Sequence, residues 1–423
     1  MSGGRPAGSF SGTGPLPPTL DGQLARLSAA VPAIGSLLEQ DLDSQRARGY
    51  FHTLREIAQQ PLTWMATARG LARQTPLLEA ALAQSGIADK RGALVLTGSG
   101  SSLYVGESST HTLQRALGVP VLACGGGGLL THLESVLPPQ TPLLVASIAR
   151  SGNSPESCGV VDLLLERRQD SRHLVMTCCA DGRLATSYRH EPRVSTIVLD
   201  QATCDRSLVM TSSFSNLALA ARALAFIGRP SEYESLASRL AWIAQHMLET
   251  HTGRLADLAG RDHRSAVFLG SGDRFGAARE AALKMLEMTA GKVATFAETF
   301  LGLRHGPMSA INDHTLLVCF LSTDPLVRAY ECDLIGELNA KRIGATKLMV
   351  GEHLPVELAA GCDVLLECPG LDTVGDDHSP LIDIVAGQLL AFFRCLRLGL
   401  RPDEPSASHV ITRVVPAFAI HRS

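Results

Sequence analysis

The feature that most constrains the fold is an internal duplication. Three pairs of segments match at nearly one offset, 172 or 173 residues: 93–102 with 266–275, 142–156 with 315–329, and 206–224 with 378–396. Several matches at a constant offset indicate two copies of one structural unit. We therefore expect two domains with the same fold.

Within each copy, short apolar runs alternate with helical stretches. In the first copy the runs read ALVLTG, VPVLACG, PLLVASI, HLVMTC and STIVLD. Near-continuous apolar strands separated by helices are typical of a parallel sheet that is covered on both faces. The expected fold class is α/β, with two tandem domains that each hold a doubly wound parallel sheet and flanking helices.

Composition and periodicity predict the boundaries. The N-terminus is rich in Gly, Pro and Ser, which favours a disordered tail, and the stretch after it has helical periodicity that Pro61 interrupts. The predicted parts are a tail (1–22), a helical N-terminal segment (23–90), a first α/β domain (91–229), a helical connector (230–260), a second α/β domain (261–400) and a C-terminal tail (401–423).

The composition argues against several classes of protein. The net charge is −3 and the pI is near 6.5, so there is no electrostatic reason to expect a nucleic acid or a membrane surface as partner. The sequence contains neither an apolar run of membrane-spanning length nor a signal-peptide pattern. Its ten cysteines form no C-x-x-C pair and no zinc-finger spacing. We expect free thiols, no metal site and a cytoplasmic location.

The first candidate site is a glycine-serine turn, LVLTGSGSS, between a predicted strand and a predicted helix. Such a turn directs backbone N–H groups and the positive end of the helix at a ligand. Ser101 or Ser102 could equally be an ordinary helix cap. A dinucleotide fingerprint is excluded because Leu103 replaces its third glycine, and no P-loop motif is present. The turn suits a smaller anion.

The second candidate site is ARSGNSPES, which follows the apolar run PLLVASI. Arg150, Ser151, Gly152 and Ser154 come just after the carboxyl end of a predicted strand, where open α/β sheets bind ligands. Two hydroxyls and the N–H groups exposed by a glycine can hold one phosphate. Ser154 followed by proline is also an ordinary helix start.

The duplication helps to choose between these two interpretations. The second copy keeps the strand but carries Asp324 and Val327 where the first copy has Ser151 and Ser154. If the serines served only the fold, the second copy would have the same need for them. An acid at this place would repel a phosphate, so we expect only the first copy to bind an anion.

A third feature is a charged face on an apolar helix, predicted from SGDRFGAAREAALKMLEMTAG with Asp273 as its N-cap. Glu280, Lys284 and Glu287 are spaced at i, i+4 and i+7 and share one face. Most such triplets are solvated ion pairs. The surrounding Ala, Leu and Met residues predict a buried helix, and charged groups on a buried helix favour a functional role.

A histidine follows in LRHGPMSAI. His305 precedes Gly-Pro on a predicted loop, so it is not a core histidine of regular structure. Glu298 lies a short distance before it in the same stretch.

Taken together, GSGSS, ARSGNSPES and LRHGPMSAI resemble the sugar isomerase (SIS) domain family. They resemble the paired SIS domains of glucosamine-6-phosphate synthase and, more closely, the family of tagatose-6-phosphate ketose/aldose isomerases, now also regarded as galactosamine-6-phosphate deaminase/isomerases. TLREIAQQPLTW and SHVITRVVP support the closer match, and the resemblance spans residues of about 45–418.

The resemblance implies roles for the candidate residues. Glu287 corresponds to the base that moves a proton, His305 to a residue that helps to open the sugar ring, and Glu298 to an acid that orients the amine or a hydroxyl. Lys284 lies beside Glu287 on the catalytic helix. The phosphate of a sugar phosphate would bind at Ser101, Ser102, Arg150, Ser151, Gly152 and Ser154. No metal or organic cofactor is expected. The family places this site near the subunit interface, so we expect a homodimer or a higher homo-oligomer.

One departure affects the expected chemistry. The synthases use a lysine near the C-terminus to hold the open sugar as an imine, whereas here no lysine follows Lys347 and the tail carries His409 and Arg413. The glutaminase part of the synthases, with Cys at position 2, is also absent, which favours ammonia release.

The expected function is a deaminase/isomerase that converts galactosamine 6-phosphate to tagatose 6-phosphate and ammonia. Two alternatives stay open: an aldose–ketose isomerase on tagatose 6-phosphate or a related hexose phosphate, and a protein that senses phosphosugars without reacting. The galacto or gluco configuration also stays open.

Overall fold

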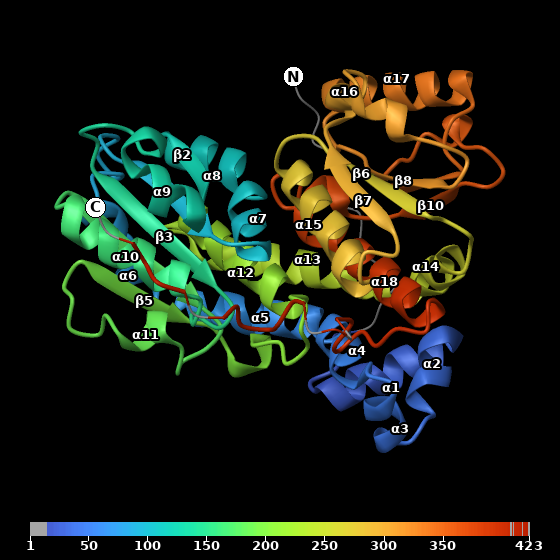
Figure 1. Ribbon diagram of the computed structural model, residues 1–423, viewed down its shortest axis with the longest axis horizontal. Helices are drawn as coiled ribbons and strands as arrows, with labels where there is room; N and C mark the ends of the chain where they lie inside the picture. The colour runs from blue at the N-terminus through green and yellow to red at the C-terminus, as the bar shows by residue number, and fades with distance from the viewer. Residues whose placement is uncertain (1–14, 407, 409, 417, 422–423) are drawn as a thin grey trace.

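The computed structural model describes residues 15–406, 408, 410–416 and 418–421. Two α/β domains lie on either side of a central group of helices, and the N-terminal helices pack below the second domain in the view of Figure 1. Each domain contains a five-stranded parallel sheet with helices around it. The predicted α/β fold class with two similar domains is confirmed.

The N-terminal segment is helical, as expected. Its helices are α1 (Leu20–Ala30), α2 (Pro32–Leu38), α3 (Leu42–Ala47), α4 (Phe51–Ala58), α5 (Gln60–Ala72) and α6 (Thr75–Gln84). The first helix begins inside the predicted tail, because Thr19 Oγ1 accepts a hydrogen bond from Gly22 N at 3.2 Å and caps it. Residues 1–14 of that tail lie outside the described residues. Pro61 stands in the first turn of α5, which confirms a helix break beside it.

The first domain has the strand order β2-β1-β3-β4-β5. Its strands are β1 (Ala93–Gly98), β2 (Val121–Gly125), β3 (Leu143–Ala149), β4 (Ser171–Thr177) and β5 (Val194–Val198). Its helices are α7 (Ser101–Glu107), α8 (Thr110–Leu117), α9 (Gly126–Val136), α10 (Pro155–Arg167), α11 (Arg183–Thr186) and α12 (Ser212–Arg222), with short 3-10 turns η1 (Gln201–Thr203) and η2 (Ala223–Phe226). Every residue of β1 and β3 is buried, as continuous apolar runs require.

The second domain repeats this topology with the order β7-β6-β8-β9-β10. Its strands are β6 (Ser265–Leu269), β7 (Ala294–Glu298), β8 (Thr315–Phe320), β9 (Thr346–Gly351) and β10 (Val364–Glu367). Its helices are α15 (Asp273–Met288), α16 (Phe300–Leu303), α17 (Pro325–Lys341) and α18 (Pro380–Arg397), with 3-10 turns η3 (Pro307–Ala310), η4 (Val356–Leu358) and η5 (Leu371–Thr373). Strand for strand, the two orders match.

The duplication extends to the backbone of the turn after the first strand of each domain. Gly100 has φ 56° and ψ −128°, and its counterpart Gly272 has φ 57° and ψ −134°. This left-handed region favours glycine. Two residues earlier, a Cβ on Gly98 would lie 2.6 Å from Ser102 Cβ, and one on Gly270 would lie 2.6 Å from the carbonyl carbon of Arg274. Both glycines therefore serve the fold.

Helices α13 (Pro230–Thr250) and α14 (Thr252–Ala259) connect the domains, and α5, α12 and α18 pack with them at the centre of the molecule (Figure 1). Buried polar contacts fix this packing. Trp64 Nε1 donates to Ser215 Oγ at 2.9 Å, and Gln60 Nε2 donates to Gln388 Oε1 at 2.8 Å. The central helices thereby hold the two sheets in one arrangement.

The first helices of the two domains, α7 and α15, pack directly against each other. Asp273 does not cap its own helix as expected, since Gly272 occupies the N-cap. Its buried carboxylate instead accepts hydrogen bonds from His111 N and Thr112 N, both at 2.9 Å, in the first domain. The second domain therefore caps a helix of the first, which fixes where α15 lies.

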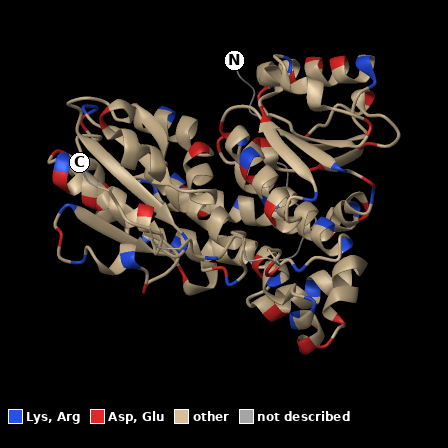
Figure 2. Cartoon of the chain, viewed as in Figure 1, with Lys and Arg blue, Asp and Glu red and all other residues tan. Residues whose placement is uncertain are grey.

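The C-terminal segment returns over the first domain after α18. Figure 1 shows it running beside β3 and α10, and Ile420 lies against Gly159 of α10. Figure 2 shows basic and acidic residues intermingled over both domains, with no extended face of one sign in that view. Among the described residues, no helix is long and apolar enough to cross a membrane.

Replacing Gly276 tests the contact between α7 and α15. A Cβ there would lie 2.7 Å from the Glu107 carbonyl carbon and from Ser108 Cα, which are backbone atoms that must shift. We expect Gly276→Ala to lower the free energy of unfolding by about 1–3 kcal/mol, measured by urea denaturation. Gly253→Ala on α14 is the matched control, since nothing lies within 4 Å of its Cβ position. If both variants are equally stable, the helices do not make this close contact.

Candidate functional site

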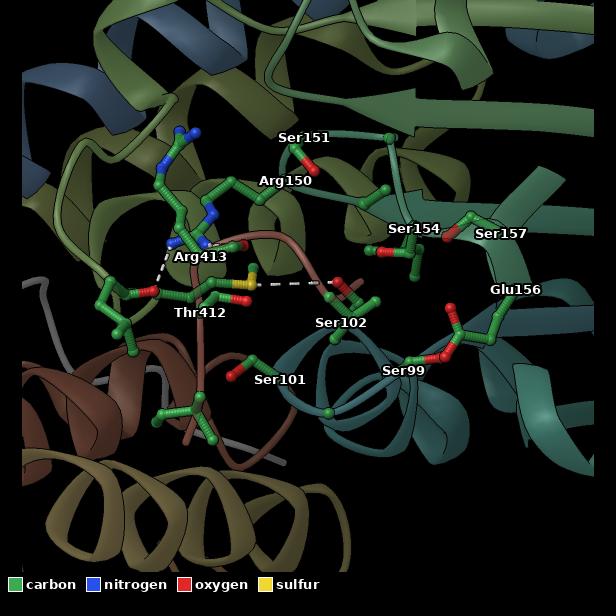
Figure 3. A pocket seen from close by; sticks show the side chains of 18 of the residues that line it. Ser99, Ser101, Ser102, Arg150, Ser151, Ser154, Glu156, Ser157, Thr412 and Arg413 are labelled. Carbon is green, nitrogen blue, oxygen red and sulfur yellow. Dashed lines mark hydrogen bonds between the residues drawn. The ribbon is translucent and has the colours of Figure 1, made fainter. Parts of the chain in front are cut away.

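A cavity of about 300 Å³ lies at the carboxyl edge of the first sheet. It is lined by the turn after β1 (99–102), the loop after β3 (148–157), the C-terminal segment (410–416) and Glu287 of α15. Figure 3 shows the hydroxyl-bearing side chains of the turn and the loop around it. The structure thus brings together all the predicted phosphate-binding residues, which are Ser101, Ser102, Arg150, Ser151, Gly152 and Ser154.

Helix capping does not account for the serines. Gly100, and not a serine, is the N-cap of α7, so Ser101 and Ser102 lie in the first turn of the helix. Ser154 is the N-cap of α10, but its side chain does not make the capping hydrogen bond. Ser102 Oγ lies 4.0 Å from Met210 Sδ, which is a weak contact. The hydroxyls of Ser102 and Ser154 are therefore available to an anion in the cavity.

The loop after β3 has a rigid backbone. Gly152 has φ 65°, and a Cβ on it would lie 3.0 Å from Leu184 Cβ. Leu184 N donates to Gly152 O at 3.0 Å, and Ser151 Oγ accepts from Asn153 N at 3.3 Å. Only glycine suits this position, because it combines a left-handed backbone with a close neighbour. Ser151 is consequently held in place before any ligand binds.

Arg150 lines the cavity, but its guanidinium is occupied by the protein. Its Nη1 donates to Ser207 O at 3.2 Å and to Leu208 O at 2.9 Å, and its Nη2 donates to Arg413 O at 2.9 Å. The side chain is buried. The geometry thus makes Arg150 a clamp that joins the 207–208 loop to the C-terminal segment.

The charged face of α15 reaches the cavity from the second domain. Lys284 is fully buried, and its Nζ lies 3.4 Å from Glu280 Oε1 and donates to Glu287 Oε2 and to Ser101 Oγ, the latter at 3.1 Å. Glu280 is also fully buried, whereas the Glu287 side chain is 22% exposed and lines the cavity. The predicted burial of this face of α15 is therefore confirmed for Glu280 and Lys284.

The surroundings of Glu280 and Lys284 shift the pKa values of both side chains. Burial is the main cause that raises the pKa of Glu280, to about 8; the neighbouring Glu287 also raises it, whereas Lys284 lowers it. Burial lowers the pKa of Lys284, but Glu280 and Glu287 raise it above its ordinary value overall. Neither carboxylate oxygen of Glu280 has a hydrogen-bond partner among the described atoms. The state that fits is a Lys284 ammonium paired with Glu287, beside a protonated Glu280.

The other two predicted catalytic residues do not join this cavity within one chain. His305 lies between α16 and η3, where it is exposed, and it is not among the described residues that line the cavity. Glu298 ends β7, and its Oε1 accepts from Thr299 N at 2.7 Å. Both belong to the second domain, at the edge of its sheet.

The second domain carries a closed counterpart of the loop after β3. At the position that matches the loop after β3, the carboxylate of Asp376 accepts from Thr323 N at 2.8 Å, from Thr323 Oγ1 at 3.1 Å and from Ser322 Oγ. Its own carboxylate therefore occupies the donors that an anion would use. This explains why only one of the two copies has an open site.

Two further residue differences between the domains contribute to closing the counterpart site of the second domain. Arg274, which stands where the first domain has Ser102, donates to both oxygens of buried Asp383 at 2.8 and 2.6 Å. Asp324, which stands where the first domain has Ser151, caps α17 by accepting from Leu326 N at 2.8 Å and Val327 N at 3.2 Å. The acid that we expected to repel phosphate thus serves a helix.

Sequence reasoning missed some of the lining residues. Ser99, Glu156 and Ser157 belong to the quoted motifs but were not singled out, although they carry polar side chains at the same turn and loop. Arg413 lines the cavity, and its guanidinium donates to Asp205 O, with Nε at 3.0 Å. His409 lies outside the described residues.

The proton on Glu280 has a consequence for stability. Its pKa is about 8 in the folded chain against 4.5 ordinarily, so the folded state binds more protons between these values. The contribution of Glu280 to the free energy of unfolding therefore falls as the pH rises through this range. Glu280→Gln removes this pH-dependent contribution. We expect the free energy of unfolding of the variant, relative to that of wild type, to rise by about 1–4 kcal/mol between about pH 5 and pH 8.

Urea denaturation across this pH range measures the effect. Glu79→Gln, at an exposed helix position, is the control and should follow wild type. A difference between Glu280→Gln and wild type that stays constant with pH would mean that Glu280 is ionised in the folded chain.

Comparison with known proteins bears on what this cavity does. No protein-family model matches the chain. A protein of Streptomyces coelicolor that carries the AgaS name is 36% identical over 376 residues, which are 88% of this chain and 95% of the relative. The D-galactosamine-6-phosphate deaminase AgaS of Shewanella sp. strain ANA-3 is 32% identical over 379 residues, which are 88% of this chain and 92% of the relative.

The solved structures agree with the sequence relatives. The crystal structure of tagatose-6-phosphate ketose/aldose isomerase from Escherichia coli superimposes with a TM-score of 0.75 at 29% identity, over 84% of this chain and 95% of that one. The identity to the AgaS proteins extends over nearly their whole length and includes both α/β domains. The chain therefore belongs to the AgaS family of SIS-type phosphosugar deaminases and isomerases.

Proposed function

We propose that the protein is a galactosamine-6-phosphate deaminase/isomerase, which converts galactosamine 6-phosphate and water to tagatose 6-phosphate and ammonia. The observation that carries this proposal is the Lys284–Glu287 pair, delivered by the second domain to a serine-lined cavity of the first. The names of the AgaS relatives support the choice of substrate.

The phosphate is placed among the hydroxyls of Ser101, Ser102, Ser151 and Ser154. This leaves the sugar carbons toward Glu287, which lines the same cavity. Hydroxyl and backbone donors to a phosphate form strong, charge-assisted hydrogen bonds. Arg150 supports the site indirectly in this proposal, because its guanidinium already holds the wall of the cavity.

The reaction follows from the opened sugar, which has an aldehyde at C1 and an amine at C2. The Glu287 carboxylate removes the C2 proton, and the electron pair moves to C1–C2 while the aldehyde oxygen gains a proton. Delivery of a proton to C1 then leaves an imine at C2. Water adds to the imine carbon, ammonia departs, and the ketose phosphate remains. General-base catalysis by a carboxylate suffices for the proton shift.

Lys284 is proposed to serve the same step. Its buried ammonium holds Glu287 in place, and it can supply positive charge near the oxygen that gains a proton. Glu280 stays neutral behind it, so the trio does not carry an excess negative charge toward the phosphate.

His305 and Glu298 are proposed to act from a partner subunit in a homodimer. Their domain exposes large apolar side chains at Leu301, Leu326 and Val356, which are 44%, 68% and 69% exposed. We propose that these side chains take part in the subunit contact. His305 would then assist ring opening in the neighbour's cavity.

The runner-up is an aldose–ketose isomerase on tagatose 6-phosphate, because the similar Escherichia coli structure carries that name. It needs the same base and phosphate site but no ammonia release. We also propose a cytoplasmic location, supported by the ten cysteines, all of which are free thiols.

A substrate panel tests the proposal. Galactosamine 6-phosphate, glucosamine 6-phosphate and tagatose 6-phosphate are each incubated with the enzyme, and ammonia and ketose are measured. We expect ammonia and ketose in equal amounts from galactosamine 6-phosphate. Isomerisation of tagatose 6-phosphate without ammonia release from either amino sugar would favour the runner-up.

Glu287→Gln tests the base. The amide keeps the size of the side chain but cannot accept the C2 proton, so we expect kcat to fall by about 10²–10⁴-fold with little change in substrate binding. Glu232→Gln, at an exposed position of α13, is the control. Weaker binding with intact turnover would mean that Glu287 only forms an ion pair with Lys284.

Ser151→Ala with Ser154→Ala tests the phosphate site. Each lost hydrogen bond to the phosphate should cost about 1.5–3 kcal/mol of substrate binding. The control is Ser36→Ala with Ser235→Ala, two exposed serines on α2 and α13. If the first double variant still prefers the phosphorylated sugar over the free sugar as strongly as wild type, the phosphate binds elsewhere.

A further inference from the structure

A second cavity shares a wall with the catalytic cavity. Its volume is about 440 Å³, and Leu208, Ile411, Thr412 and Arg413 line both cavities. Its other walls come from α3, α4, the loop before α12 and the segment after α18. The proposed reaction makes no use of it.

Basic side chains dominate the lining of this second cavity. They are Arg46, Arg206, Arg401, Arg413 and His52. Burial lowers the pKa of His52, and the nearby arginines lower it further against the raising by Asp403, so we count it as neutral. The lining contains four guanidinium groups and two acids, Asp403 and Glu404. The lining therefore carries an excess of about two positive charges near neutral pH.

The carboxylate of Asp403 is already engaged. Its Oδ1 accepts from Thr53 N and Thr53 Oγ1, both at 2.7 Å, and its Oδ2 accepts from His52 N at 3.1 Å. It thereby caps α4. In the part of the chain that the structure describes, the guanidinium groups of Arg206 and Arg401 have neither a hydrogen bond nor an ion pair. These two donors are free to face the cavity.

The shared wall is tied to both cavities by hydrogen bonds. Leu208 N donates to Asp403 O at 2.9 Å, which joins the loop before α12 to the segment after α18. Arg150, on the catalytic side, donates to the carbonyl oxygens of Leu208 and Arg413, both at 2.9 Å. A ligand that moves this wall from one side must change the cavity on the other.

We propose that the second cavity is an anion site for a phosphate dianion, either inorganic phosphate or a phosphate ester, and that its occupancy is coupled to the catalytic cavity through the shared wall. Guanidinium groups match the geometry of phosphate oxygens. The excess of positive charge in the lining matches the charge of a dianion. This inference goes beyond the proposed reaction and holds for either candidate substrate.

The test is a calorimetric titration of the full chain with inorganic phosphate. Wild type should bind two phosphates per chain. Arg206→Gln with Arg401→Gln should keep the catalytic site and weaken the second by about tenfold or more for each arginine lost. Ser151→Ala with Ser154→Ala should keep the second site and weaken the first. Arg189→Gln with Arg264→Gln, two exposed arginines outside the cavity, makes the same change in net charge and should keep both sites.

The different variants distinguish a failure of this inference from a failure of the proposed function. Retention of both sites at wild-type affinity in Arg206→Gln with Arg401→Gln would overturn the second site, as would a wild type that binds one phosphate only. Binding at the catalytic site in the arginine variant shows that the variant is folded. Coupling is measured in the serine variant by hydrogen exchange of residues 410–416, which phosphate should slow. Unchanged exchange at saturating phosphate would overturn the coupling.

Discussion

The site depends on one buried ammonium. Lys284 lies where α15 of the second domain meets α7 of the first, and it contacts Glu280, Glu287 and Ser101. An unpaired charge in such a place would be strongly unfavourable, and removing one partner of a buried pair typically costs about 3–5 kcal/mol. Because Ser101 belongs to the turn that is proposed to bind the phosphate, this contact also sets the distance between that turn and Glu287. Packing of the domains and the geometry of the proposed site are therefore one constraint.

The two domains show how one fold can yield an open and a closed site. In the first, small hydroxyl side chains surround a cavity after β1 and β3. In the second, Arg274 and Asp376 fill the matching place with opposite charges from the chain itself. The closed copy contributes a helix instead, and this helix carries Glu287. Duplication followed by this division of roles explains why the site needs both domains.

Much of the fold could be predicted because its signals are local. Strands β1 and β3 of the first domain are nearly continuous apolar runs with all residues buried, and the offset between the copies implies the second sheet. Strand β9 has a weaker apolar signal, since it contains Lys347, whose Nζ pairs with Asp363 at 2.8 Å. The start of α1 was misplaced because a single threonine cap decides it.

The site was predictable in its residue types more than in its contacts. Sequence motifs predict the serines, and helical periodicity predicts the charged helix. The hydrogen bonds of Arg150 to the carbonyl oxygens of residues 207, 208 and 413 depend instead on loops, which have no periodic sequence pattern. The same holds for Asp376, which is far in sequence from the loop whose donors it occupies. His305 illustrates another limit, since its motif did not predict that it lies outside the described lining of the cavity in its own chain.

The central claim is that Glu287 moves a proton from C2 of an opened amino sugar phosphate. Galactosamine 6-phosphate deuterated at C2, followed by NMR during turnover, tests it most directly. The account predicts that ammonia release is accompanied by loss of deuterium from C2, with the label appearing at C1 of the ketose or in the solvent. Ammonia release with deuterium retained at C2 would contradict it, because the amine would then leave without cleavage of the C2–H bond.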